Sequence, residues 1–184
     1  MHQISKALYF PPVYEASSEG ILAVGGDLSP ERLLLAYKSG IFPWFNPGEP
    51  ILWWAPKSRM VLCFDELAVS KSMRNILNRN TFTVTFNQNF SEVISNCSSV
   101  KREGQQGTWI SQEMREAYCI LNEMGIAKSV EVWQNNELVG GLYGIDLGDV
   151  FCGESMFSKV SNASKIAFIS LAQHLKKENY KILD

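Results

Sequence analysis

The sequence has 184 residues, of which 46% are hydrophobic and 20% are charged, with a formal net charge of −2. This composition is that of a globular chain able to bury a core, which excludes a disordered protein and one that needs disulfides to fold. The near-neutral charge also excludes nucleic-acid binding through overall charge, so any RNA contact has to come from a local basic patch.

Several residue types that carry common chemistries are sparse or scattered. Of the two histidines, His2 lies near a terminus and His174 inside a predicted helix, which argues against a His-based triad or a His/Cys metal site, and no phosphate-binding glycine loop occurs. We therefore expect no metal and no cofactor. The start of the chain lacks the layout of a signal peptide and no apolar run approaches a membrane span, which favours a cytoplasmic protein without membrane contact. A monomer is expected. The four cysteines share apolar surroundings typical of buried free thiols in a reducing compartment: Cys63, Cys97, Cys119 and Cys152.

The first half of the chain is predicted to contain short elements separated by turns. Ser29 is expected to cap a helix that stops at Gly40, because Pro30 suits its first turn. The segment 40–48 is too rich in proline for a regular element. Further predicted elements are strands at 51–54, 60–64 and 81–86, helices after Ser70 and over 90–97, and a polar, mobile loop over 98–107.

The second half is predicted to form a helix, an antiparallel meander, another helix and a last strand. Ser111 should cap the first helix, which ends at Gly125, and Asn135-Asn136 should form a two-residue hairpin turn. The strands are expected at 129–134, 137–145, 150–155 and 180–184, with the second helix running from a cap at Ser161 or Asn162 to about 177. This order is that of the GCN5-related N-acetyltransferase fold, an analogy of fold alone.

Six sequence blocks carry a resemblance that extends over nearly the whole chain. They are EGILAVGGDLSP at 19–30, GIFPWF at 40–45, PILWWAP at 50–56, GTWI at 107–110, LVGGLYG at 138–144 and FCGESMFS at 151–158. Together they resemble the leucyl/phenylalanyl-tRNA–protein transferase family.

This resemblance implies transfer of leucine or phenylalanine from aminoacyl-tRNA to acceptor proteins that begin with Arg or Lys, which marks those proteins for degradation. It implies no coenzyme A and no ATP. The expected fold is α+β, with a small N-terminal α/β domain over 1–62. An acyltransferase-like domain with a mainly antiparallel mixed sheet should follow over 63–184. Transfer of methionine, and the preference among the three amino acids, stay open.

Two carboxylates match catalytic positions of the family. Glu154 follows Gly153 at a strand end, where a small neighbour lets a ligand approach, although a solvated acid is the commoner meaning of such a residue. Asp184 closes the apolar run Ile182-Leu183. In the family the matching aspartate acts with a glutamine two positions on, beyond this sequence, so we expect a domain truncated at its C-terminus.

The resemblance also assigns substrate-binding residues. Trp44 and Trp109 match residues that sandwich the terminal adenosine, since a base stacks on an aromatic ring. Trp53, Trp54 and Trp133 are interpreted as packing residues. The amino-acid pocket should be lined by residues that spacing alone would place in the core: Leu142, Phe151, Phe168 and Leu183.

Contacts with tRNA are expected from the helix after Ser70. This helix, expected over 70–79, carries Lys71, Arg74 and Arg79, which would contact phosphates without reading sequence. A solvated helix face is the alternative interpretation.

Two rival functions stand beside the one that the family implies. A coenzyme A-dependent N-acetyltransferase would need a glycine-containing loop over 158–165, where no glycine occurs, and a non-catalytic aminoacyl-tRNA-binding module would need no chemistry at all.

Overall fold

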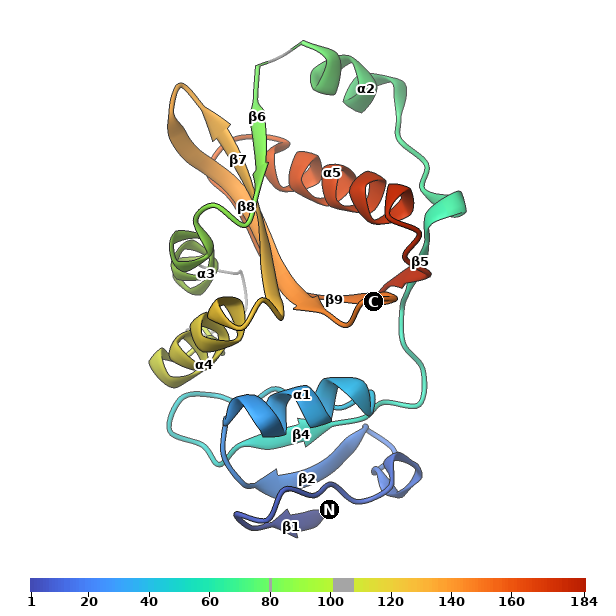
Figure 1. Cartoon of the computed structure of the whole chain (residues 1–184), viewed down its shortest axis with the longest axis vertical. Helices are drawn as coiled ribbons and strands as arrows, with labels where there is room; N and C mark the ends of the chain where they lie inside the picture. Colours follow the sequence, from blue (N-terminus) through green and yellow to red (C-terminus); the bar gives the residue numbers. More distant parts are fainter. Residues whose placement is uncertain (80, 101–107) are drawn as a thin grey trace. The chain divides into compact units, whose positions relative to one another are not determined.

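The computed structural model describes residues 1–79, 81–100 and 108–184, which form two compact units. The first unit contains Met1–Arg59 and the described part of the segment 101–121. The second contains Met60–Val100 and Asn122–Asp184 (Figure 1). Both units combine helices with a mixed sheet, so the predicted α+β class is confirmed.

The first unit is built on a four-stranded sheet in the order β1-β2-β4-β3. Its strands are β1 (His2–Ile4), β2 (Ile21–Gly25), β3 (Phe42–Pro43) and β4 (Leu52–Trp54). The short 3-10 helix η1 (Val13–Glu15) and helix α1 (Pro30–Lys38) complete its N-terminal part. The prediction of no regular element over 40–48 was wrong at two residues, because β3 pairs with β4. A proline is tolerated there because β3 is an edge strand.

Helix α1 begins where the sequence predicts, but its cap differs from the expected one. Ser29 occupies the N-cap without bonding a helix N–H; its hydroxyl donates to Asp27 Oδ1 at 2.5 Å. The Ser29 hydroxyl, aided by Arg32, lowers the pKa of Asp27 below its usual value. Arg32 Nε lies 3.2 Å from the same carboxylate, and its side chain is almost fully buried. Asp27 therefore stabilises the start of α1 by its ion pair with Arg32, which lies in the first turn of that helix.

The second unit is built on a six-stranded sheet in the order β5-β10-β9-β8-β7-β6. β10 runs parallel to β9, and every other neighbouring pair is antiparallel. Helices α3 and α5 lie on opposite sides of this sheet (Figure 1). The strands are β5 (Leu62–Cys63), β6 (Thr83–Phe86), β7 (Ala127–Gln134), β8 (Glu137–Asp146), β9 (Val150–Ser158) and β10 (Ile182–Leu183). This is the predicted mainly antiparallel mixed sheet.

The helices follow the predicted order with small shifts. They are η2 (Phe64–Glu66), α2 (Lys71–Asn78), α3 (Phe90–Ser99), α4 (Gln112–Glu123) and α5 (Ala163–Lys177). Because α3 continues to Ser99, the loop predicted over 98–107 begins later than expected, and its residues 101–107 lie outside the described part of the chain. Ser111 caps α4 as predicted, since its hydroxyl accepts from Met114 N at 3.2 Å.

The meander closes at the predicted hairpin. Asn135 and Asn136 both have positive φ, 51° and 64°, the backbone of a tight two-residue turn. β9 extends to Ser158, three residues beyond the predicted strand, because it pairs with β8 as far as Gly140. Asn162 sits at the N-cap of α5 in the left-handed region without a side-chain cap bond.

Three glycines of β8 are explained by close packing. A Cβ on Gly140 would lie 2.5 Å from Ala163 Cβ at the start of α5, and one on Gly141 would lie 2.7 Å from the Val130 carbonyl oxygen. A Cβ on Gly144 would overlap the Cys152 carbonyl oxygen and the Phe151 ring. The absence of side chains therefore lets α5 and the neighbouring strands approach β8.

Within the described residues, no helix combines the length and apolar character needed to cross a membrane.

Candidate active site

Glu154 and Asp184 come from neighbouring parallel strands of the second unit. Asp184 N donates to the Phe151 carbonyl at 2.9 Å, and Gly153 N donates to the Asp184 carbonyl at 2.8 Å. These two bonds continue the β9–β10 ladder past Leu183 and fix the backbone of Asp184 beside Gly153 and Glu154. Both carboxylate residues are partly buried. The backbones of Glu154 and Asp184 thus lie close together at one end of the β9–β10 ladder.

Gly153 leaves space beside this pair. It is exposed, and the nearest atom to a Cβ built on it would be the Asp184 carbonyl oxygen at 3.5 Å, an ordinary contact. Unlike the glycines of β8, Gly153 is therefore not required by packing. Whether its small size serves the approach of a ligand to Glu154, as expected from sequence, stays a prediction.

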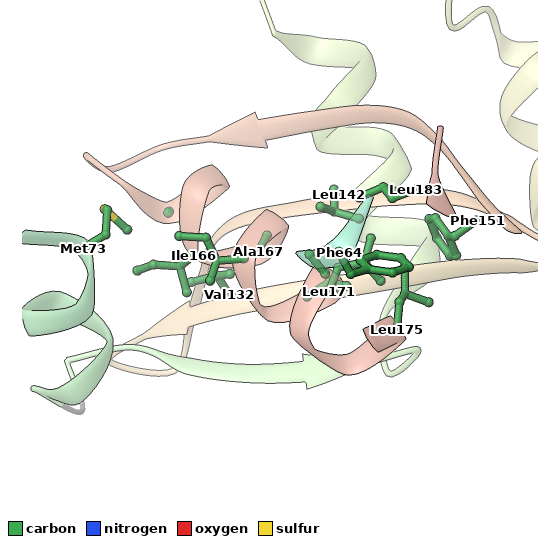
Figure 2. Close-up of a cluster of buried hydrophobic side chains, with 14 of the residues drawn as sticks. Phe64, Met73, Val132, Leu142, Phe151, Ile166, Ala167, Leu171, Leu175 and Leu183 are labelled. Atoms are coloured by element: carbon green, nitrogen blue, oxygen red, sulfur yellow. The ribbon is translucent and has the colours of Figure 1, made fainter. Parts of the chain in front are cut away.

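The four predicted pocket residues gather in one apolar cluster against α5. Leu142, Phe151 and Leu183 are buried members of this cluster, and the partly buried Phe168 packs against it. Phe151 and Leu183 are direct partners in the β9–β10 ladder. Figure 2 shows Leu142, Phe151 and Leu183 among the buried apolar side chains of this cluster, and Phe151 and Leu175 of α5 line the same cavity. Phe151 and Leu183, on β9 and β10, together with Leu142 of β8 and Phe168 of α5, therefore form an apolar wall in the same unit as the two carboxylates.

A small cavity of about 200 Å³ adjoins this wall, and sequence reasoning did not identify it. Phe151 lines it with Leu171 and Leu175, and Asp146, His174 and Tyr180 supply polar groups. The Tyr180 hydroxyl donates to Asp146 Oδ1 at 2.8 Å. Burial, together with this bond, raises the pKa of Tyr180 to about 12, so its phenol stays protonated at neutral pH. Tyr180 therefore serves as a hydrogen-bond donor here and not as a base.

Trp44 and Trp54 form an aromatic pair in the first unit. Trp44 is 46% exposed, and its ring centroid lies 5.3 Å from that of Trp54. Trp54 Nε1 donates to the Trp44 carbonyl at 2.7 Å. Trp54, interpreted from sequence as a packing residue, therefore orients both the ring and the backbone of Trp44. Trp53 fits the packing interpretation, since it is fully buried and donates to the Gly25 carbonyl at 2.9 Å.

Trp109 also belongs to the first unit and is partly buried. It lies two residues before the cap of α4, and its carbonyl accepts from Ser111 N at 2.9 Å. This bond ties the Trp109 backbone to the start of a helix whose inner face, including Met114 and Tyr118, is buried. Trp109 thus lies just before the capped start of α4, with part of its surface exposed.

Helix α2 presents the predicted basic residues to solvent. The Ser70 hydroxyl accepts from Met73 N at 3.3 Å and caps the helix, while Met73 is buried in the apolar cluster. Lys71 and Arg74 are exposed and lie three residues apart, which puts them on one face of the helix. Arg79 is exposed at the C-cap.

The described residues contain no group of three or more His, Cys, Asp or Glu side chains able to hold a metal ion.

Comparison with known proteins gives a match over most of the sequence. A family model described as leucyl/phenylalanyl-tRNA protein transferase matches residues 61–184, and the model of that family's N-terminal domain matches residues 26–57. The chain belongs to the leucyl/phenylalanyl-tRNA–protein transferase family. The two matched regions meet between residues 57 and 61, close to the junction of the two compact units.

Relatives within the family are similar over the full length of the chain. The leucyl/phenylalanyl-tRNA–protein transferase of Flavobacterium johnsoniae is 75% identical over 184 residues, covering 100% of this chain and 87% of the relative. That of Flavobacterium psychrophilum is 65% identical with the same coverage. The enzyme of Syntrophus aciditrophicus is 56% identical over 98% of this chain and 76% of its own length.

A comparison with solved structures gives a much more distant likeness. L-PGS from Bacillus licheniformis aligns with a TM-score of 0.47 and 13% identity, covering 90% of this chain and 52% of that one. A likeness at this level adds nothing to the assignment, which rests on the sequence relatives.

The structure distributes the residues assigned by the family resemblance over its two units. Glu154, Asp184 and the apolar residues around them belong to the second unit, as do the basic residues of α2. Trp44 and Trp109 belong to the first. The structure also draws attention to Trp54 and Tyr180, which the sequence did not single out as candidate site residues. Both lie in apolar or strand-like runs, where no sequence pattern distinguishes them.

Proposed function

We propose that this chain transfers leucine or phenylalanine from aminoacyl-tRNA to the N-terminal Arg or Lys of acceptor proteins. The observation that carries the proposal is the match to transferases of that name over the whole chain, at up to 75% identity among the relatives given above. Marking of the acceptors for degradation, action as a monomer and the domain boundary at residue 62 belong to the same proposal. Transfer of methionine is left open.

The chemistry proposed is direct attack of the acceptor's α-amine on the aminoacyl ester. The ester is already activated, and an α-amine with a pKa near ~7.7–8.0 is partly neutral at cellular pH. Alignment of the two substrates can supply on the order of 7–11 kcal/mol of the barrier reduction. The N–C bond forms as the C–O bond to the tRNA ribose breaks, and the amine's proton leaves with the ribose oxygen. Neither a metal nor a nucleotide is needed for this step.

Each candidate residue is given one role. Glu154 and Asp184 would hold the attacking amine and the aminoacyl end, and their shared strand ladder supports that assignment. Leu142, Phe151, Phe168 and Leu183 would take the leucine or phenylalanine side chain; their apolar surroundings suit such a group. Trp44 and Trp109 would stack the terminal adenosine, and the basic residues of α2 would contact phosphates.

An assay of labelled leucine transfer distinguishes this proposal from its rivals. Purified protein is mixed with leucyl-tRNA or with acetyl-coenzyme A, and with an acceptor that begins with Lys or, as the matched control, with Met. The proposal expects label on the Lys acceptor from leucyl-tRNA alone. Acetylation of the acceptor would support an N-acetyltransferase, and binding of leucyl-tRNA without any transfer would support a binding module.

A further inference from the structure

A polar hollow of about 480 Å³ lies on the second unit at β6 and the β7–β8 hairpin. Threonines of one strand face, Thr81, Thr83 and Thr85, line one side of it, and Trp133 lines it from the neighbouring strand. Four amide side chains from Gln88 and the hairpin turn complete the lining, and none of the lining residues is charged. Neither the carboxylates nor the apolar wall of the candidate active site takes part in it.

The wall of this hollow is held by a partly buried hydrogen-bond network that ends on a buried carboxylate. Trp133 Nε1 donates to Thr85 Oγ1 at 2.8 Å, and Thr85 Oγ1 donates to Glu131 Oε2 at 2.7 Å. Glu131 is fully buried and also accepts from Ser129 Oγ at 2.6 Å. Because each donor in this network has an acceptor, the indole ring of Trp133 is fixed in place before any ligand binds.

β6 borders the hollow and is an edge strand. It runs beside β7 (Figure 1) and, among the described residues, pairs with no other strand. Natural edge strands are usually protected from pairing by their shortness, a lysine, a proline, a bulge or a covering element. β6 is short, with four residues, but it has no charged residue and no proline, and its register with β7 is regular. Its outer backbone groups are therefore suited to accept one more strand.

The chemistry of the hollow favours a polypeptide over a nucleic acid. Binding of nucleic acids draws most of its affinity from Lys and Arg side chains that neutralise phosphates, and the lining contains neither. Hydroxyl and amide groups beside an open strand edge suit an uncharged peptide, which gains affinity from main-chain hydrogen bonds and specificity from alternate side-chain pockets. Resting on the proposed function, we propose that an extended segment of the acceptor protein, downstream of its reacting residue, adds to β6 and places a side chain against Trp133.

The sheet order sets how far this segment lies from the acceptor's N-terminus. β6 is three strands from β9, which carries Glu154, and four from β10. At about 4.8 Å per strand, the separation across the sheet is ~14–19 Å. An extended chain covers about 3.3 Å per residue, so at least about five residues must separate the reacting N-terminus from the docked segment. Short acceptors cannot use the hollow.

Comparison of a short and a long acceptor tests this inference. KM and kcat of the full protein are measured for a dipeptide and for a peptide of about fifteen residues with the same first two residues, which is long enough to reach β6. The inference expects a lower KM for the long peptide. Replacing its downstream residues with prolines should remove the advantage, because proline cannot donate to a strand ladder.

Thr83→Lys, at an exposed position of the hollow, should raise KM about fivefold or more for the long peptide alone. Gln134→Lys across the hollow serves as the second variant, and Gln173→Lys on the exposed face of α5 is the matched control. Equal KM for both peptides in the parent protein, or an advantage that survives both hollow variants, would overturn the inference. The inference would also be overturned if β6 proved to pair with β6 of a second copy of the chain in a dimer. It would likewise be overturned if the hollow variants lost tRNA binding while their KM for the acceptor stayed unchanged. Absence of transfer to either peptide would instead contradict the proposed function.

Discussion

At the residue scale, the sequence identified side chains that could bind a substrate but not the interactions that hold them. Trp44 and Trp109 stand out because they lie next to turns and glycines, and both keep part of their surface exposed. Their supports come from Trp54, ten residues away from Trp44 along the chain, and from Ser111. The side-chain interactions of a strand residue depend on its tertiary neighbours, so the role of Trp54 was not readable from its run of apolar residues.

Trp109→Ala tests the stacking role at this scale. Loss of one base–aromatic stack is worth roughly 1–3 kcal/mol, so KM for charged tRNA should rise about 5- to 150-fold. The fold should remain intact because Trp109 is only partly buried. Trp109→Phe is the matched control and should retain most of the affinity. An unchanged KM in the alanine variant, with a native near-ultraviolet circular dichroism spectrum, would exclude the stacking role.

At the scale of elements, most helices and strands were predictable and their packing was not. The alternation of β6 and the period of α3 and α5 follow from apolar spacing, and the Asn135-Asn136 turn follows from the tolerance of asparagine for positive φ. The two-residue strand β3 was missed because proline usually excludes a strand, whereas its edge position permits one. Pairing between β9 and β10 is a long-range interaction that no local pattern encodes.

Helix α2 makes a salt-dependent prediction. Neutralising Lys71 and Arg74 with glutamine should weaken tRNA binding about equally for different tRNA sequences, since phosphate contacts do not read bases. The slope of log affinity against log salt should fall by roughly one for each phosphate that is no longer neutralised. Asn75→Gln on the same helix, which removes no charge, is the control. A double variant with an unchanged salt slope would show that α2 does not bind the tRNA.

The glycines of β8 make a stability prediction. Gly144→Ala should lower the free energy of unfolding by about 1–3 kcal/mol, because its Cβ would overlap the Cys152 carbonyl and the Phe151 ring. Gly153→Ala is the matched control in the next strand, where a Cβ makes only ordinary contacts. Denaturant unfolding measures both. Equal stability of the two variants would contradict the packing explanation for the LVGGLYG run.

At the scale of the whole molecule, family membership defines the function more sharply than either unit does alone. The second unit supplies two carboxylates on adjoining strands and an apolar wall, and the first supplies partly exposed tryptophans. Composition excluded several classes of function, but the residue blocks shared with the family were needed to reach a reaction. The edge strand β6 and its hollow follow from topology, which the sequence alone did not provide.

The most direct test of the account is the chemical identity of the modified acceptor. Purified protein, leucyl-tRNA and a Lys-initiated acceptor are incubated, and the product is analysed by intact mass and N-terminal sequencing. The account predicts one leucine joined to the α-amino group, and no reaction when that group is acetylated beforehand. An unmodified acceptor would contradict it, provided the Flavobacterium johnsoniae relative modifies the same acceptor under the same conditions.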